Sequence, residues 1–88
     1  MSGKLTILKE ISLERNRQDE KWGEQNHNNF IWATILGEEY GEACQASFNE
    51  WFDPATSPIA GTIRIREELI QVAAVAVAWI EAIERRGS

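Results

Sequence analysis

Hydrophobic and polar positions along the chain divide it into three segments with helical spacing. Over residues 5–20, leucines and isoleucines recur at helical intervals among charged residues, which predicts an amphipathic helix with one narrow apolar stripe. Over about residues 30–51, apolar side chains fall on overlapping helical faces without an intervening proline, which predicts a second helix. A third helix is expected to begin near Gly61 or Thr62 and to run to about Arg86.

The two segments between these helices carry residues that favour turns. The first, WGEQNHNN at 22–29, combines a glycine, three asparagines and a histidine, so the first helix is expected to end near Trp22. The second, FDPATSPIAG at 52–61, contains two prolines, and both are expected to break any helix. Strand-like alternation and internal repeats are absent, so the sequence predicts one all-α domain, residues 1–88, with about three main helices.

The third predicted helix is too apolar for a chain of this size. Between Leu69 and Ile80, only Gln71 is not apolar. A helix that is hydrophobic all round must be covered on every side, and two other helices in 88 residues do not suffice. We therefore expect a helical bundle completed by further copies, as a dimer or a dimer of dimers. The apolar run from Leu69 to Ile83 is shorter than the roughly 20 residues that cross a bilayer, so no membrane partner is expected.

Composition and charge exclude several classes of function. The net charge is −5, and five acidic residues in two short clusters account for the whole excess, which argues against a nucleic-acid partner. Cys44 is the only cysteine, so no intrachain disulfide forms, and with the lone His27 it cannot complete a four-ligand zinc site. A reducing, cytoplasmic location is expected, and no signal peptide is recognisable.

The acidic clusters carry the candidate chemistry. They are Glu38-Glu39-Tyr40-Gly41-Glu42 in the second predicted helix and Glu67-Glu68-Leu69-Ile70-Gln71 in the third. Side chains three positions apart rise from one helix face, so Glu39 pairs with Glu42, and Glu68 pairs with Gln71. Antiparallel packing of the two helices is expected to bring both pairs together beside the core.

Clustered carboxylates at the edge of a core are costly unless they are protonated, ion-paired or bound to metal. A single EExxE segment is more often a solvated face, but a second acidic motif beside an apolar helix reverses that balance. Oxygen ligands without histidine or cysteine favour Mg²⁺, with Mn²⁺ as the alternative. A di-iron bundle would need Glu-x-x-His pairs, and no predicted helix contains a histidine. A phosphate-binding glycine loop is also absent, and a Cys44–His27 nucleophile pair lacks an orienting group.

Three segments together resemble a known family. They are EEYGE at 38–42, REELIQVAAVAVAWIEAIERR at 66–86 and the upstream ERNRQDEKWGEQNH at 14–27. Together they resemble the small, single-domain MazG-like branch of the all-α nucleoside triphosphate pyrophosphohydrolases, whose pattern is EExxE followed by ExxD. The resemblance implies Mg²⁺-dependent cleavage of a (d)NTP substrate into (d)NMP and pyrophosphate, which clears non-standard or excess nucleotides.

The resemblance also implies roles for individual residues. Glu39, Glu42 and Glu68 match metal ligands, and Glu38 matches the leading acid, so Glu38 and Glu39 are the candidate catalytic residues. Gln71 stands where the motif has Asp; its amide oxygen still binds a hard cation, with less charge.

Substrate contacts are expected upstream of the first motif. Trp22, in a polar loop, is a candidate for stacking on the base or for capping the core. Arg17, Lys21 or an arginine of the third predicted helix is the candidate for the phosphates. The alternative function is a non-catalytic helical oligomer that binds nucleotide or metal, or an interaction module.

Overall fold

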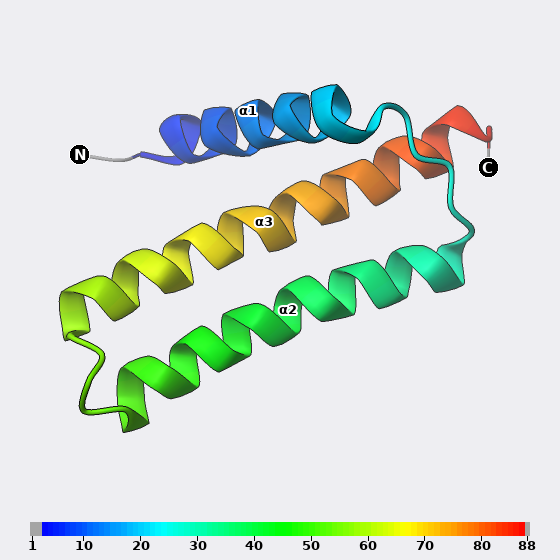
Figure 1. Ribbon diagram of the computed structural model, residues 1–88. Coiled ribbons are helices and arrows are strands. Elements are labelled where there is room, and N and C mark those ends of the chain that lie inside the picture. The colour runs from blue at the N-terminus through cyan, green and yellow to red at the C-terminus, as the bar shows by residue number, and fades with distance from the viewer. Residues whose placement is uncertain (1–2, 88) are drawn as a thin grey trace.

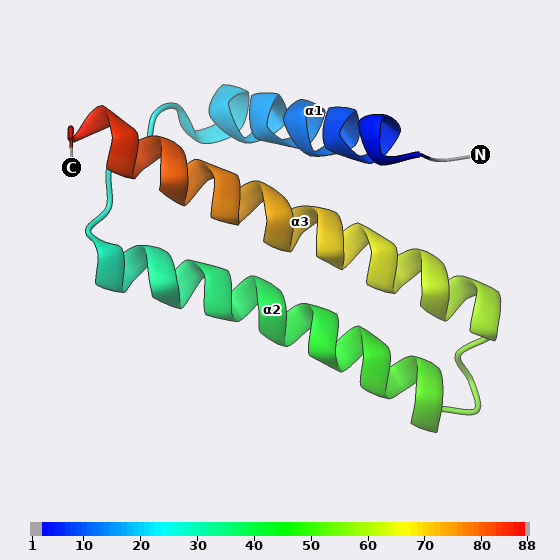
Figure 2. The same ribbon diagram turned by 180° about the vertical axis from the view of Figure 1, so that it is seen from behind.

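The computed structural model describes residues 3–87 and contains three helices in that range. They are α1 (Lys4–Trp22), α2 (Asn29–Phe52) and α3 (Pro58–Arg85). The all-α prediction is confirmed for these residues. The helix α3 lies between the other two; α1 runs in the same direction as α3, and α2 runs antiparallel to it (Figures 1 and 2). Within the described range, α1 and α2 each pack on α3 and not on each other.

The helix boundaries follow from capping residues. The Asn28 side chain accepts a hydrogen bond from the Ile31 N–H at 2.9 Å, which begins α2. Gly23, with φ +71°, ends α1 at the point where the turn-rich segment starts.

The predicted start of the third helix was wrong. The helix begins at Pro58 rather than at residue 61 or 62, because the Ser57 hydroxyl accepts from the Ala60 N–H at 3.1 Å and caps it. Proline fits the first helical turn, where its missing N–H has no intrahelical partner to lose. Only Pro54 lies in the loop, which is therefore shorter than expected.

Ion pairs between distant positions fix α1 on α3. In the first half of α1, Glu10 accepts two hydrogen bonds of 2.7 and 2.8 Å from Arg66 of α3. In its second half, the largely buried Arg15 donates to Glu81 of α3 at 2.6 Å. Two such contacts, one on each side of the middle of α1, set both the position and the rotation of this helix.

The core lies between α2 and the C-terminal half of α3. Its buried members are Trp32, Val75, Ala78 and Ala82, and the small alanines let the two helices approach closely. Arg85 and Arg86 donate to carbonyl and amide oxygens of residues 25–29, and so tie the first loop to the end of α3. The loop that carries Trp22 at its entry is thus held against the core.

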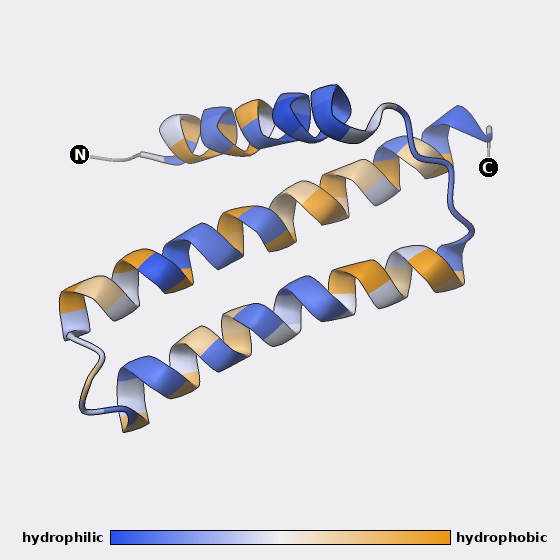
Figure 3. Ribbon diagram, in the orientation of Figure 1, coloured by the Kyte–Doolittle hydropathy of each residue, from blue (hydrophilic) through white to orange (hydrophobic). Residues whose placement is uncertain are grey.

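Much apolar surface stays uncovered in the single chain. Hydrophobic residues recur along α2 and α3 (Figure 3), and Leu69 and Ile80 of the apolar stretch are 52% and 56% exposed. No helix among residues 3–87 is both long enough and apolar enough to cross a membrane.

Candidate metal centre

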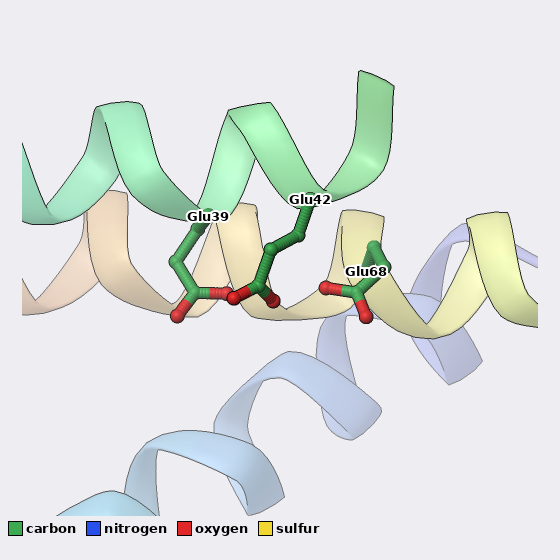
Figure 4. Close-up of side chains that lie close together, drawn as sticks. All are labelled: Glu39, Glu42 and Glu68. Atoms are coloured by element: carbon green, nitrogen blue, oxygen red, sulfur yellow. The ribbon is translucent and has the colours of Figure 1, made fainter. Parts of the chain in front are cut away.

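Three glutamates from two helices meet on one side of the α2–α3 pair. Glu39 and Glu42 rise from adjacent turns of α2, and Glu68 faces them from α3 (Figure 4). One carboxylate oxygen from each lies within 4.8 Å of the others. The antiparallel packing of α2 on α3 therefore brings together the three acids that the sequence assigned to a metal.

Glu68 is the most buried member of this cluster. Its Oε1 lies 2.9 Å from the Nε of Arg64, one turn earlier on α3. Its Oε2 is buried and has no hydrogen-bond partner among residues 3–87. Because a buried carboxylate oxygen is costly without a donor or a cation, this oxygen fits a metal ligand.

Burial and neighbouring carboxylates disfavour the ionised form of Glu39. Its pKa is raised above the ordinary value, first because burial disfavours the charged form and then because Glu42, Glu68, Glu38 and Glu14 repel it. A bound divalent cation reverses both effects, since it replaces lost hydration and neutralises the surrounding charge. The electrostatics of the cluster thus favour cation binding.

Gln71 and Glu14 extend the site toward α1. Gln71 is half-buried and lines a cavity of about 170 Å³ together with Glu39. The pKa of Glu14 is lowered, mainly by a hydrogen bond from Arg17, with burial opposing it and the nearby Gln71 and Gln18 amides lowering it further. The neutral residue of the second motif therefore shares a cavity with a cluster glutamate.

The other residues predicted for the site lie around it. Glu38 is exposed and next to the cluster, close enough to raise the pKa of Glu39. Trp22 is half-exposed and lines the same cavity as Glu39, and the Lys21 ammonium lies 4.6 Å from the Trp22 ring centroid. Arg17 is exposed and ion-paired with Glu14.

A second, more polar cavity adjoins the cluster on the other side. Its volume is about 330 Å³, and its lining includes Glu42, Gln45, Asn49, Thr56 and Arg64. The cavity beside Glu39 is lined by the indoles of Trp22 and Trp32, by aliphatic side chains and by the amides of Gln18, Gln25 and Gln71. The cluster therefore adjoins two cavities, of which only the one beside Glu39 has aromatic walls.

Two residues near the cluster were not singled out from the sequence. Arg64 was covered only by the general expectation that an arginine of the third helix contacts the phosphates, although its place four positions before Glu68 on one helix, where opposite charges pair, could have identified it. Glu14 gave no such signal, because its place depends on how α1 docks on α3, and that docking depends on contacts between residues more than fifty positions apart.

The donor set defines the chemistry available. It consists of carboxylate oxygens with a neighbouring amide, a combination suited to hard cations such as Mg²⁺ or Mn²⁺. Comparison with models of protein families, with curated proteins and with solved structures finds no match to this chain. The class supported by the structure is thus an all-α protein with a candidate oxygen-ligand metal centre.

Proposed function

We propose that this protein is a Mg²⁺-dependent nucleoside triphosphate pyrophosphohydrolase of the MazG-like type, with Mn²⁺ as an alternative ion. It cleaves (d)NTP to (d)NMP and pyrophosphate and so clears nucleotides from the cytoplasmic pool. The observation that carries the proposal is the convergence of Glu39, Glu42 and Glu68, with one Glu68 oxygen buried and unpartnered within residues 3–87. The same three residues belong to the two motifs that resemble the family pattern, and those motifs were identified from the sequence alone.

The residues divide into ligands and helpers. Glu39, Glu42 and Glu68 would hold the cation, with the Gln71 amide oxygen as a further candidate ligand. Mg²⁺, when bound, would supply charge neutralisation, polarisation of the phosphoryl oxygens and acidification of a water. Glu38 is exposed next to the cluster, so its carboxylate stays free to accept a proton from the attacking water.

The two cavities match the two ends of a nucleotide. On the Glu39 side, Trp22 offers an exposed indole face on which a base stacks. On the Glu42 side, Arg64 and neutral polar side chains suit the departing pyrophosphate. On α1, Arg17 next to Glu14 and Lys21 next to Trp22 are the candidates that would add positive charge for the phosphates.

We further propose that the working form is a homo-oligomer. A stripe at helical spacing runs along the exposed face of α2 and contains two glycines, one cysteine and three aromatic side chains: Gly37, Tyr40, Gly41, Cys44, Phe48 and Trp51. A Cβ built on either glycine meets nothing within 4 Å among the described residues, so no close packing within the chain explains these helix-weakening positions. A second copy packed along this stripe would cover the aromatics and use the space above the glycines.

The deciding experiment measures products directly. The purified full chain is incubated with a panel of NTPs and dNTPs, with and without Mg²⁺, and nucleoside monophosphate and pyrophosphate are quantified. We expect equal amounts of both products, formed only with the metal. Glu39→Gln should abolish release, whereas Glu67→Gln, an equal charge change at an exposed site on α3, should retain it. A folded protein that releases no pyrophosphate from any nucleotide with Mg²⁺ or Mn²⁺ would overturn the proposal.

A further inference from the structure

A charged cavity adjoins the cavity beside Glu39. Its volume is about 250 Å³, and four residues line both cavities: Gln18, Gln25, Trp32 and Ala78. The remaining lining of the charged cavity is formed mostly by Arg15, Asp19, Glu24 and Arg85. Residues that line both cavities form a shared wall, and its polar groups are available to a molecule that enters from the metal cluster.

The amide of Gln18 in this wall is held by an arginine. Gln18 is only 8% exposed, and its Oε1 accepts a hydrogen bond of 3.0 Å from Nη1 of Arg15. The Arg15 guanidinium is itself fixed, because its Nε donates to Glu81 at 2.6 Å and its Nη2 donates to Asp19 at 2.9 Å. Since the amide oxygen is already engaged, Gln18 offers a ligand the N–H groups of its NH₂.

The indole of Trp32 supplies a second donor in the same wall. Trp32 is 2% exposed, and its Nε1 is buried without a hydrogen-bond partner among residues 3–87. A buried N–H group without an acceptor costs free energy, and a ligand that brings an acceptor removes this cost. The shared wall therefore suits a ligand that presents hydrogen-bond acceptors.

We propose that this wall selects the base of the nucleotide, and that it favours a pyrimidine with two carbonyl groups, uracil or thymine, over cytosine. The two carbonyl oxygens accept from Gln18 and Trp32. Cytosine carries an amino group in place of one carbonyl, so one donor of the wall would meet another donor and stay unpaired. The inference rests on the proposed function, because Glu39 and Trp22 line the same cavity and would hold the metal-bound phosphates and the face of the base.

The loop side of the wall is held in place by α3. Arg85 donates to the Gln25 carbonyl oxygen at 2.9 Å, and its Nε lies 3.4 Å from the Glu24 carboxylate. A wall that is ordered before the ligand arrives pays little conformational entropy on binding. The choice between bases should therefore be measurable as a difference in affinity.

Substrate analogues that cannot be cleaved test this choice without any measurement of catalysis. The full chain is titrated calorimetrically, in the presence of Mg²⁺, with α,β-imido-dUTP and with α,β-imido-dCTP. We expect the dUTP analogue to bind at least about tenfold more tightly, the size of effect typical when one buried donor is left unpaired. Equal affinities, or tighter binding of the dCTP analogue, would overturn the inference and leave the hydrolase proposal standing.

Replacement of the Gln18 amide by a carboxylate should reverse the preference. Gln18→Glu exchanges a donor for an acceptor, which pairs with the amino group of cytosine, so the dCTP analogue should become the tighter ligand. Trp32→Phe keeps an aromatic ring but removes the N–H, and should bring the two affinities closer together. The matched control is Asn16→Asp, the same chemical change at an exposed position of α1, which should keep the wild-type preference. If Gln18→Glu prefers the dUTP analogue as strongly as Asn16→Asp does, Gln18 does not read the base and the inference is wrong.

The wild-type titrations do not depend on any variant folding. If neither analogue binds in the presence of Mg²⁺, the inference is overturned. Release of pyrophosphate from purine nucleotides in the substrate panel would then keep the hydrolase proposal, and its absence from the whole panel would remove both.

Discussion

Arg64 and Glu68 form an ion pair that is satisfied on one side only. The Arg64 Nε lies 2.9 Å from Glu68 Oε1, whereas Oε2 of the same carboxylate is buried without a partner in the described chain. Arg64 is 64% exposed, so most of its guanidinium remains in solvent. The buried Glu68 carboxylate is thus paired through one oxygen with a largely exposed arginine, and its other oxygen is available to a metal cation.

Arg64→Met should destabilise the metal-free protein and strengthen its binding of Mg²⁺. The metal-free chain loses about 1–3 kcal/mol of folding free energy, because a buried carboxylate is left without its donor. Mg²⁺ binding should tighten, since a competing positive charge is gone, while pyrophosphate release slows. Thermal melts with EDTA and with Mg²⁺ measure the first two effects. Lys9→Met is the control, because it removes an equal charge from an exposed position of α1 away from the cluster and should leave Mg²⁺ affinity unchanged.

Glu39→Gln should stabilise the metal-free protein at neutral pH. The pKa of Glu39 is raised on folding, so its ionised form is less favourable in the folded state than in the unfolded chain. This penalty is full at neutral pH, declines as the pH falls through the raised pKa, and is gone below the ordinary value of 4.5. Denaturant unfolding in EDTA from pH 7 to pH 4 should therefore show a stability gain that shrinks to zero on acidification. The same variant should lose the Mg²⁺-induced rise in Tm; a gain that persists at pH 4 contradicts this cause.

Glu38→Gln should separate proton transfer from metal binding. Glu38 is exposed beside the cluster, so its loss should leave the Mg²⁺-induced rise in Tm nearly intact. Turnover should fall by about 10²–10⁴, the range for removal of a general base. Parallel melts and pyrophosphate assays on Glu38→Gln and Glu39→Gln make the comparison. Equal loss of metal binding in both variants would instead make Glu38 a ligand.

Local sequence signals predicted the helices and the cluster of glutamates. Glu39 and Glu42 share one face of α2 because of the 3.6-residue helical turn. Glu68 lies near them because a short connection makes α2 and α3 pack antiparallel. The start of α3 was missed because a proline was interpreted as a helix breaker, although Ser57 made it a first-turn residue. The place of Glu14 near the site could not be predicted, because it depends on how α1 docks on α3 through long-range ion pairs such as Arg15–Glu81.

Gly61→Ala should destabilise the α2–α3 hairpin. A Cβ at this buried position would lie 2.5 Å from Cγ and 2.7 Å from Cβ of Glu50 on α2, so one helix must shift. The cost of overpacking, about 1–3 kcal/mol, exceeds the roughly 1 kcal/mol gained by replacing a glycine within a helix. Denaturant unfolding monitored by circular dichroism measures the difference. An unchanged or higher midpoint would mean that the helices are not so close at this point.

Gly37→Ala and Gly41→Ala should each stabilise the folded chain and weaken its association with a second copy. Within one described chain, each methyl enters open space and should raise helix stability by up to about 1 kcal/mol. If a second copy packs along the stripe on α2, the same methyls hold the helices apart and raise the dissociation constant. Sedimentation velocity across a dilution series, paired with denaturant melts, should show wild-type oligomers at micromolar concentration and weaker association in both variants. Gly3→Ala, which also meets open space but lies outside α2, is the control. If the wild-type protein sediments as a folded 10.0 kDa monomer, the oligomer proposal is contradicted. If both variants associate as the wild type does, the interface lies elsewhere, and the exposed Leu69 and Ile80 of α3 are the next residues to mutate.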